Sequence, residues 1–254
     1  MSNPDQAKQD YDNIADDYNN RYAPTVTGAL EGQLIEAALG DLTGLTVLDL
    51  GGGSGTHART AVEQGAVAVD IVDVSPGMLK AAADTEKALG RNVMRFFEAD
   101  VGKPLTHLPL REEGYDVVMA NWVLDYAGTP DLLEAMLRSA VGHLKSGGLF
   151  VGIRVANPHS RNLKSGKYGV MLQRLEPILG GVKYTVKVID PPIEIEASAL
   201  DMICSGSPKV YEEAGLTNVE IVPYEAAGVV QKNPEFWKGF VEDPFFAVTK
   251  AVMK

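Results

Sequence analysis

Residues 47–58 constrain the fold of this chain more than any other stretch. The first four of them, 47–50, are mostly apolar, which is typical of a short strand buried in a parallel sheet. Residues 51–55 then hold four glycines, and the residues that follow can begin a helix. Glycine lets the backbone turn tightly and lets a ligand lie against the main chain, and the first turn of a helix offers free N–H groups to that ligand. This stretch therefore predicts an α/β fold with a nucleotide or nucleoside site at the turn.

Two patterns fit the glycine-rich turn. The sequence G-S-G-T-H-A, which begins at Gly53, satisfies the G-x-G-x-x-A pattern of dinucleotide sites, in which Asp73 would bind a ribose hydroxyl. The sequence D-L-G-G-G-S-G, which begins at Asp49, resembles the first motif of the class I S-adenosylmethionine-dependent methyltransferases. That motif is an acid, one further residue and then G-x-G-x-G, and Asp49, Gly51, Gly53 and Gly55 match it without a gap.

Asp49 distinguishes the two patterns. A carboxylate at the buried end of a strand is costly unless a cationic or hydrogen-bonding partner meets it. The amino group in the methionine part of S-adenosylmethionine would be such a partner, whereas a pyrophosphate would be repelled. The methyltransferase resemblance is therefore favoured. The alternative is an NAD(P)-dependent oxidoreductase, in which Asp49 and Asp100 would have no role.

Further acids follow the next two predicted strands. The resemblance implies that Asp73 accepts hydrogen bonds from both ribose hydroxyls of the cofactor and that Asp100 accepts one from the adenine amino group. Asp70 lies in the middle of its strand and is a less suitable ribose partner. Three carboxylates at the ends of three successive strands are what an open α/β sheet needs to surround one nucleoside. The cofactor-binding residues that the resemblance implies are Asp49, Gly51, Gly53, Gly55, Asp73, Val74, Met78, Asp100, Val101 and Asn121.

The predicted strand 115–120 ends in Asn121 and Trp122, and the resemblance implies that this strand end faces the transferable methyl group. Amino methyltransferases of DNA, RNA and some protein glutamines carry Asn/Asp-Pro-Pro-aromatic here, and this chain does not. The sequence D-P-P-I, which begins at Asp190, is similar to that motif but lies far downstream. We interpret it as a turn, and a small-molecule acceptor is favoured.

Aromatic side chains are expected to form the acceptor pocket. Trp122 and Tyr126 follow the strand end, and Tyr11 and Tyr18 lie in a stretch that resembles the N-terminal cap helix of small-molecule methyltransferases. Such a set suits a planar or apolar acceptor. Asp125 and Tyr126 are the candidate catalytic residues, although a base is needed only where the nucleophile carries a proton. Where it carries none, positioning of the two reactants suffices.

The resemblance implies a Rossmann-like, doubly wound, seven-stranded sheet in the order 3-2-1-4-5-7-6, with the last strand antiparallel and helices on both faces. We expect a single domain over residues 1–254, with N-terminal cap helices in residues 1–40 and an insertion in residues 156–205 that forms a lid or a substrate wall. Within the insertion, residues 168–179 are predicted to form a helix. Residues 183–189 alternate between apolar and polar, which predicts a strand of a hairpin or of a sheet edge.

Charge and composition disfavour several classes of protein. The formal net charge is −11, which disfavours nucleic acid as a partner. The single cysteine fits a reducing compartment, and the four histidines are too scattered for a metal site. No stretch approaches the length of a membrane span, and the polar N-terminus lacks the regions of a secretory signal. We expect a cytoplasmic monomer or homodimer that needs no metal, nucleic acid or membrane.

The leading hypothesis is an S-adenosylmethionine-dependent methyltransferase (EC 2.1.1 type) that methylates N, O or S of a small-molecule acceptor and releases S-adenosyl-L-homocysteine. Secondary metabolism is a setting that fits. The first alternative is the oxidoreductase described above. The second is a protein that binds S-adenosylmethionine without transferring its methyl group, because a fold alone does not fix a reaction. The sequence leaves the acceptor open.

Overall fold

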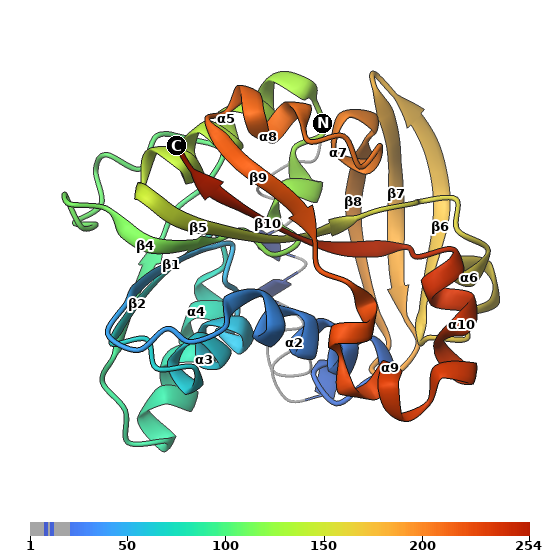
Figure 1. The fold of residues 1–254 in the computed structure, drawn as a ribbon, viewed down its shortest axis with the longest axis horizontal. Coiled ribbons are helices and arrows are strands. Elements are labelled where there is room, and N and C mark those ends of the chain that lie inside the picture. Colours follow the sequence, from blue (N-terminus) through green and yellow to red (C-terminus); the bar gives the residue numbers. More distant parts are fainter. Residues whose placement is uncertain (1–7, 10, 13–20) are drawn as a thin grey trace.

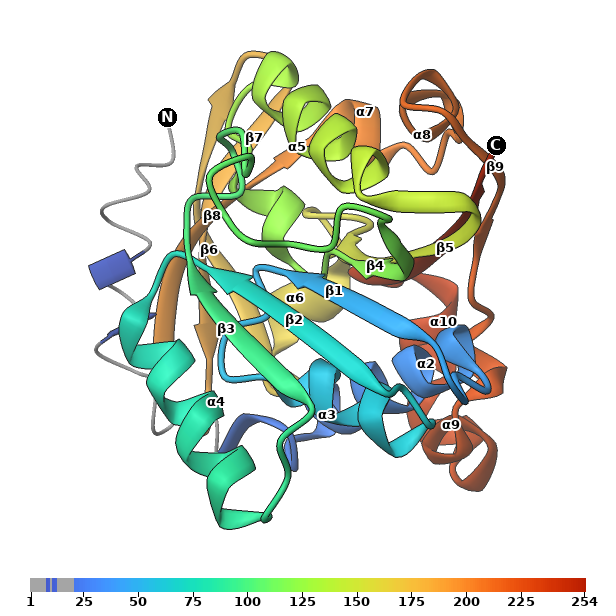
Figure 2. The same cartoon turned by 90° about the vertical axis from the view of Figure 1, so that its left-hand side faces the viewer.

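The computed structural model describes residues 8–9, 11–12 and 21–254. It contains a seven-stranded sheet in the order β3-β2-β1-β4-β5-β10-β9 (Figures 1 and 2). β1 pairs in parallel with β2 and β4, whereas β10 runs antiparallel to both of its neighbours. Because β9 and β10 are the sixth and seventh strands of this sheet, the predicted order 3-2-1-4-5-7-6 is confirmed. The strands are β1 Thr46–Leu50, β2 Ala68–Asp73, β3 Met94–Glu98, β4 Tyr115–Met119, β5 Leu144–Val155, β9 Leu216–Ile221 and β10 Phe246–Met253.

Helices cover both faces of this sheet, as predicted. In Figure 1, α2, α3 and α4 lie on one face, and α5 and α8 lie on the other. Leu30 and Leu34 of α2 belong to the apolar core on the first face, and Leu133 and Leu137 of α5 pack with Phe150 on the second. Full burial of each such side chain contributes roughly 1.5–3 kcal/mol. The helices are α2 Val26–Leu39, α3 Thr56–Glu63, α4 Pro76–Ala88, η2 Val123–Tyr126, α5 Pro130–Gly142, α6 Arg161–Ser165, α7 Asp201–Cys204, α8 Lys209–Glu213, η3 Tyr224–Ala226, α9 Gly228–Lys232 and α10 Pro234–Glu242.

α4 and α5 each begin with a side chain that caps the helix. The Ser75 hydroxyl oxygen accepts a hydrogen bond from the Met78 N–H (3.0 Å), and the Thr129 hydroxyl oxygen accepts one from the Leu132 N–H (3.3 Å). Each cap satisfies a donor that the first helical turn leaves open. The short turn before α4 keeps Asp73, the last residue of β2, at the edge of the sheet.

A second sheet of three antiparallel strands stands beside one end of the main sheet (Figure 1). Its order is β6-β7-β8, with β6 Val170–Ile178, β7 Gly181–Val188 and β8 Ile193–Leu200. The strand expected from the alternation in residues 183–189 is present as part of β7. Ile193, Ile195 and Ala197 of β8 are buried, whereas Glu194 and Glu196 between them are exposed, so one face of this sheet is apolar.

The helix predicted for residues 168–179 is wrong, because most of this stretch is strand β6. The pairing of β6 with β7 shifts its register between Gln173 and Glu176, and Arg174 has a φ of +51°. An irregularity of this kind interrupts the alternation of apolar and polar residues. The strand period is therefore hidden in the sequence, and the apolar residues that remain mimic helical spacing.

Other boundaries of the prediction also differ from the structure. β5 begins at Leu144, ahead of the apolar run of residues 149–155, because pairing with β4 continues across a register shift between Tyr115 and Val117. α2 lies within the predicted cap region of residues 1–40, but much of that region, including Tyr18, is outside the described residues. No helix in the described part of the chain is both long and apolar enough to cross a membrane.

Candidate active site

The glycine-rich turn lies between β1 and α3, and its shape requires glycine. Gly51 and Gly53 have φ values of +68° and +53°, which side-chain-bearing residues rarely adopt. At Gly52 the reason is space, because a Cβ atom there would lie 2.7 Å from Oδ2 of Asp49. Gly55 is the N-cap residue of α3. The turn therefore brings bare backbone close to the carboxylate that ends β1.

Asp49 is 1 % exposed, and both of its carboxylate oxygens are without a hydrogen-bond partner among the described residues. Burial, together with the nearby negative charge of Asp73, raises the pKa of this carboxyl to about 8. A buried carboxylate without partners is costly. A ligand that brings positive charge or hydrogen-bond donors to Asp49 would remove that cost, so the structure fits the cationic amino group that the sequence predicts.

Asp73 and Asp100 lie at the ends of the next two strands. Asp73 accepts hydrogen bonds from the N–H groups of Gly53 and Ser75, both at 2.8 Å, and burial raises the pKa of its carboxyl to about 6. Asp100 accepts a hydrogen bond from the Gly102 N–H (2.9 Å). A carboxylate has four lone pairs, so these contacts leave acceptor sites for a ligand. Asp70 instead pairs with Arg95 (2.7 Å), in agreement with its exclusion as a ribose partner.

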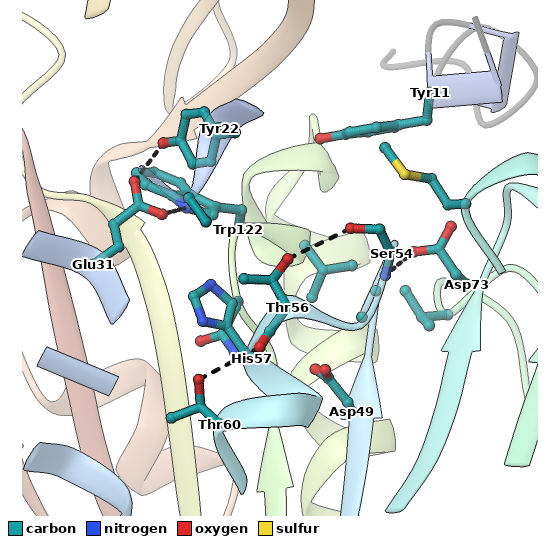
Figure 3. Close-up of a pocket in the computed structure, with 18 of the residues that line it drawn as sticks. Tyr11, Tyr22, Glu31, Asp49, Ser54, Thr56, His57, Thr60, Asp73 and Trp122 are labelled. Atoms are coloured by element: carbon teal, nitrogen blue, oxygen red, sulfur yellow. Dashed lines mark hydrogen bonds between the residues drawn. The ribbon is translucent and has the colours of Figure 1, made fainter. Parts of the chain in front are cut away.

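A cavity of about 480 Å³ lies along this edge of the main sheet (Figure 3). His57 of α3 lines it as well, and burial, together with the charge of Arg59, lowers the pKa of its imidazole to about 4. Gly55 is the one predicted cofactor residue that does not line the cavity. The other predicted cofactor residues all line it: Asp49, Gly51, Gly53, Asp73, Val74, Met78, Asp100, Val101 and Asn121. Their role in binding stays a prediction.

The end of β4 continues into an unusual turn. The Asn121 side-chain oxygen accepts a hydrogen bond from the Ile153 N–H (3.2 Å), which holds this end against β5. Trp122 then has a φ of +62°, a conformation that is rare for a bulky residue and that clusters at functional sites. Its indole N–H donates a hydrogen bond to Oε2 of Glu31 (3.1 Å). The aromatic ring predicted to line an acceptor pocket is thus fixed by a carboxylate from α2.

Sequence reasoning missed Glu31, which is 1 % exposed. Its other oxygen, Oε1, accepts a hydrogen bond from the Tyr22 hydroxyl (2.6 Å), and burial raises the pKa of its carboxyl to about 7. A signal was available in the helical period, because Thr27, Glu31 and Ile35 recur at intervals of four on the buried face of α2. A charged residue on such a face needs a special reason.

Asp125 and Tyr126 of η2, the predicted catalytic residues, differ in exposure. Asp125 is 4 % exposed, its Oδ2 accepts a hydrogen bond from the Val155 N–H (3.1 Å), and burial raises the pKa of its carboxyl to about 8. Its Oδ1 has no partner among the described residues. The hydroxyl of Tyr126 lies 2.8 Å from the hydroxyl of Tyr11. His159 is exposed, and it lines neither the larger cavity nor a second, smaller cavity beside it.

A second cavity, of about 80 Å³, lies between η2 and the three-stranded sheet. Its walls are mostly apolar and include Val170, Leu172, Val186, Val188 and Ile195 of the three strands. The two cavities adjoin, because five side chains from the described part of the chain line both of them: Tyr11, Tyr22, Glu31, Trp122 and Tyr126. The predicted substrate residues Tyr11, Trp122 and Tyr126 are therefore brought together, while Tyr18 lies outside the described residues.

Comparison with known proteins finds a family model that matches part of this chain, and solved structures that share its fold. Residues 47–148 match the family model of a methyltransferase domain, whereas no curated protein matches the chain in sequence. The S-adenosylmethionine-dependent methyltransferase of Mesorhizobium loti has a similar structure, with a TM-score of 0.59 and 21% identity over 89% of this chain and 99% of that chain. The methyltransferase CcbJ of Streptomyces caelestis gives a TM-score of 0.58 and 21% identity over 96% of this chain and 98% of that chain. The N-methyltransferase NodS of Bradyrhizobium japonicum, solved with S-adenosylhomocysteine, gives 0.59 and 14% identity over 98% of each chain.

Proposed function

We propose that this chain transfers a methyl group from S-adenosylmethionine to a nitrogen, oxygen or sulfur atom of a small molecule. Residues 47–148 match a methyltransferase domain, and the fold is similar to that of S-adenosylmethionine-dependent methyltransferases. The observation that carries the proposal is the carboxylate of Asp49, which is buried beneath the glycine-rich turn without a partner among the described residues. Asp73 and Asp100 line the same cavity. A nucleoside that carries a cationic amino acid satisfies all three acids at once.

Each side of the larger cavity would hold one part of this cofactor. Asp49 would accept hydrogen bonds from the amino group of the methionine part, and Asp73 from the ribose hydroxyls. Asp100 and the backbone N–H of Val101 would hold the adenine ring, with Met78 packed against its face. Support for these roles comes from the lining of the cavity, which includes all five residues.

Positioning is the main task of the protein in such a reaction. The bound cofactor supplies a methyl group on a sulfonium, which is intrinsically electrophilic. The chain must hold the nucleophile of the acceptor in line with that methyl group and keep water away. Trp122, fixed by Glu31, and the paired hydroxyls of Tyr11 and Tyr126 stand where the two cavities adjoin. They would orient the acceptor, and the second cavity would take up its apolar part.

Calorimetric titration tests the cofactor assignment. S-adenosylmethionine and S-adenosylhomocysteine should bind, and NAD should not. Asp49→Asn should weaken S-adenosylhomocysteine binding by at least about tenfold, because a charge-assisted hydrogen bond is lost. Asp84→Asn is the matched control, since Asp84 is an exposed acid on α4 that lines neither cavity. Binding of NAD in preference to S-adenosylhomocysteine, or an unchanged affinity in Asp49→Asn, would contradict the assignment.

Turnover separates a methyltransferase from a protein that only binds the cofactor. A panel of small amines, phenols and thiols, incubated with S-adenosylmethionine, should yield S-adenosylhomocysteine with at least one acceptor. Release should depend on the acceptor and should disappear in Asp49→Asn. If the protein bound the cofactor tightly but released no S-adenosylhomocysteine in response to any acceptor, methyl transfer would be refuted and the cofactor site would still be supported.

A further inference from the structure

Among the described residues, the junction of the two cavities contains one carboxylate, that of Glu31. The other four side chains that line both cavities are aromatic: Tyr11, Tyr22, Trp122 and Tyr126. Figure 3 shows the Tyr22 hydroxyl and the Trp122 indole converging on the carboxylate of Glu31, across the cavity from Asp73. Glu31 therefore lies at the acceptor side of the junction, held in one orientation by two donors.

Glu31 has no basic neighbour to balance its charge in the described part of the chain. Its two hydrogen bonds come from neutral groups, and no lysine, arginine or histidine forms an ion pair with it among the described residues. Each carboxylate oxygen has two lone pairs, so one acceptor site on each oxygen is left for a ligand. A buried carboxylate in such surroundings gains most from a ligand that carries positive charge.

The second cavity is also lined by an acidic side chain and by no basic one in the described part of the chain. Within the described residues, neither lysine nor arginine lines it, while the carboxylate of Asp125 does. The positive charge of Arg154 lies near Asp125, but the Arg154 guanidinium does not line the cavity and donates hydrogen bonds to the Thr249 hydroxyl (3.3 Å) and to the carbonyl of Val155 (3.2 Å). Aromatic rings, which attract cations through their faces, make up much of the remaining wall. The side chains that carry them are Tyr11, Tyr22, Trp122, Tyr126, Tyr184 and Phe245.

The proposed cofactor accounts for only part of the negative charge around these cavities. It would occupy Asp49, Asp73 and Asp100 in the larger cavity. Glu31 and Asp125 are left on the acceptor side, where apolar walls raise the cost of an unpaired charge. A neutral acceptor would leave Glu31 without a counter-charge among the described residues, and an anionic acceptor would be repelled.

We propose that the acceptor is a lipophilic amine whose ammonium group binds Glu31 and whose apolar body occupies the cavity lined by β6, β7 and β8. This inference rests on the proposed function, because it assigns the acceptor side of the same site. In the reaction, the ammonium gives one proton to the carboxylate of Glu31. The freed nitrogen lone pair forms the new N–C bond, the C–S bond breaks and its electron pair stays on sulfur. The positive charge of the sulfonium thus passes to the methylated amine.

A set of three probes of similar shape tests this charge preference. 2-Phenylethylamine, neutral 2-phenylethanol and anionic phenylacetate are titrated calorimetrically into the protein saturated with S-adenosylhomocysteine. The amine should bind at least about tenfold more tightly than the alcohol, and phenylacetate should bind most weakly, as expected for a charged hydrogen bond in an apolar site. An alcohol that binds as tightly as the amine would overturn the proposal, as would binding of none of the three.

Glu31→Gln removes the charge and keeps the shape of the side chain. It should lower the affinity for 2-phenylethylamine by at least about tenfold and leave that for 2-phenylethanol unchanged. Glu194→Gln is the matched control, because Glu194 is an exposed acid of β8 that lines neither cavity. Persistence of the amine preference in Glu31→Gln would refute the role of Glu31. An unchanged affinity of Glu31→Gln for S-adenosylhomocysteine shows that the site is intact, whereas failure of the wild-type protein to bind that compound would instead refute the proposed function.

Discussion

The buried carboxylates carry most of the functional information in this molecule. Asp49, Glu31 and Asp125 are each less than a twentieth exposed, at 1 %, 1 % and 4 %. Burial raises the pKa of each carboxyl, to about 8, 7 and 8 respectively. Natural folds keep such groups where a ligand or a proton transfer needs them. These buried carboxyls therefore lower the stability of the unliganded protein, and they form a site that attracts cations.

The raised pKa of Asp49 predicts how the free energy of unfolding depends on pH. In the unfolded chain an aspartate ionises near pH 4, whereas in the folded protein it ionises near pH 8, so the folded state retains the proton in between. The contribution of Asp49 to the free energy of unfolding is thus fully present below about pH 4 and is lost as the pH rises toward 8. Asp49→Asn has no proton to lose. Relative to wild type, the variant should gain up to about 1.4 kcal/mol of stability per pH unit in this window.

Urea denaturation of the unliganded proteins at pH 5, 6, 7 and 8 measures this difference. The gain of Asp49→Asn over wild type should increase with pH, while the exposed control Asp84→Asn should show no such increase. A gain that is the same at all four pH values would mean that Asp49 titrates in the folded protein much as it does in the unfolded chain.

The turn after β1 was the most predictable element of the site. Positions that require glycine for backbone or steric reasons can be recognised in the sequence. Ser75 and Thr129 similarly indicate where their helices begin. The junction of the two cavities has no such local sequence signal. Glu31 becomes meaningful only when Tyr22 and Trp122, the latter 91 residues away, are brought to its two oxygens. Contacts of this kind depend on tertiary packing, so no local pattern reports them.

The three-stranded sheet is the element that shapes the acceptor side, and Ala197 of β8 is suited to test this. Ala197 is 5 % exposed and lines the second cavity. Ala197→Leu adds apolar volume to a cavity of about 80 Å³ and should displace the body of an acceptor. We expect the KM for any acceptor identified by turnover to rise by roughly tenfold or more, with S-adenosylhomocysteine affinity unchanged in calorimetry.

Glu194→Leu provides the control for the Ala197 variant. It places a leucine on β8 at an exposed position outside both cavities, and it should leave the acceptor KM as in wild type. If Ala197→Leu also left the KM unchanged, the second cavity would not be where acceptors bind.

At the scale of the whole molecule, the site is assembled from parts that are distant in the sequence. The strands of the main sheet position Asp49, Asp73 and Asp100 of the larger cavity, α2 supplies Glu31 and the three-stranded sheet supplies the apolar wall. The strand order and the helices on both faces were implied by the family resemblance that Asp49, Asp73 and Asp100 carry, and the structure confirms them. The strand β6 was not predicted, because its register shift hides the strand period. The motifs of the resemblance thus predict the main sheet, and they do not predict the acceptor side.

Asp12, in the described part of the N-terminal stretch, connects that stretch to the start of α4. Oδ1 of Asp12 accepts hydrogen bonds from the Ser75 hydroxyl (2.6 Å) and the Gly77 N–H (2.9 Å), at the positive end of the helix dipole. These contacts hold the neighbouring Tyr11, which lines both cavities. Contacts of this type are worth about 0.5–2 kcal/mol, so Asp12→Ala should weaken S-adenosylhomocysteine binding by roughly 2- to 30-fold in calorimetry. Because the main core is untouched, the urea midpoint of the unliganded protein should change little. A lower urea midpoint together with unchanged S-adenosylhomocysteine binding would show that Asp12 only stabilises the fold. The control Asp84→Asn, on α4, should change neither the midpoint nor the binding.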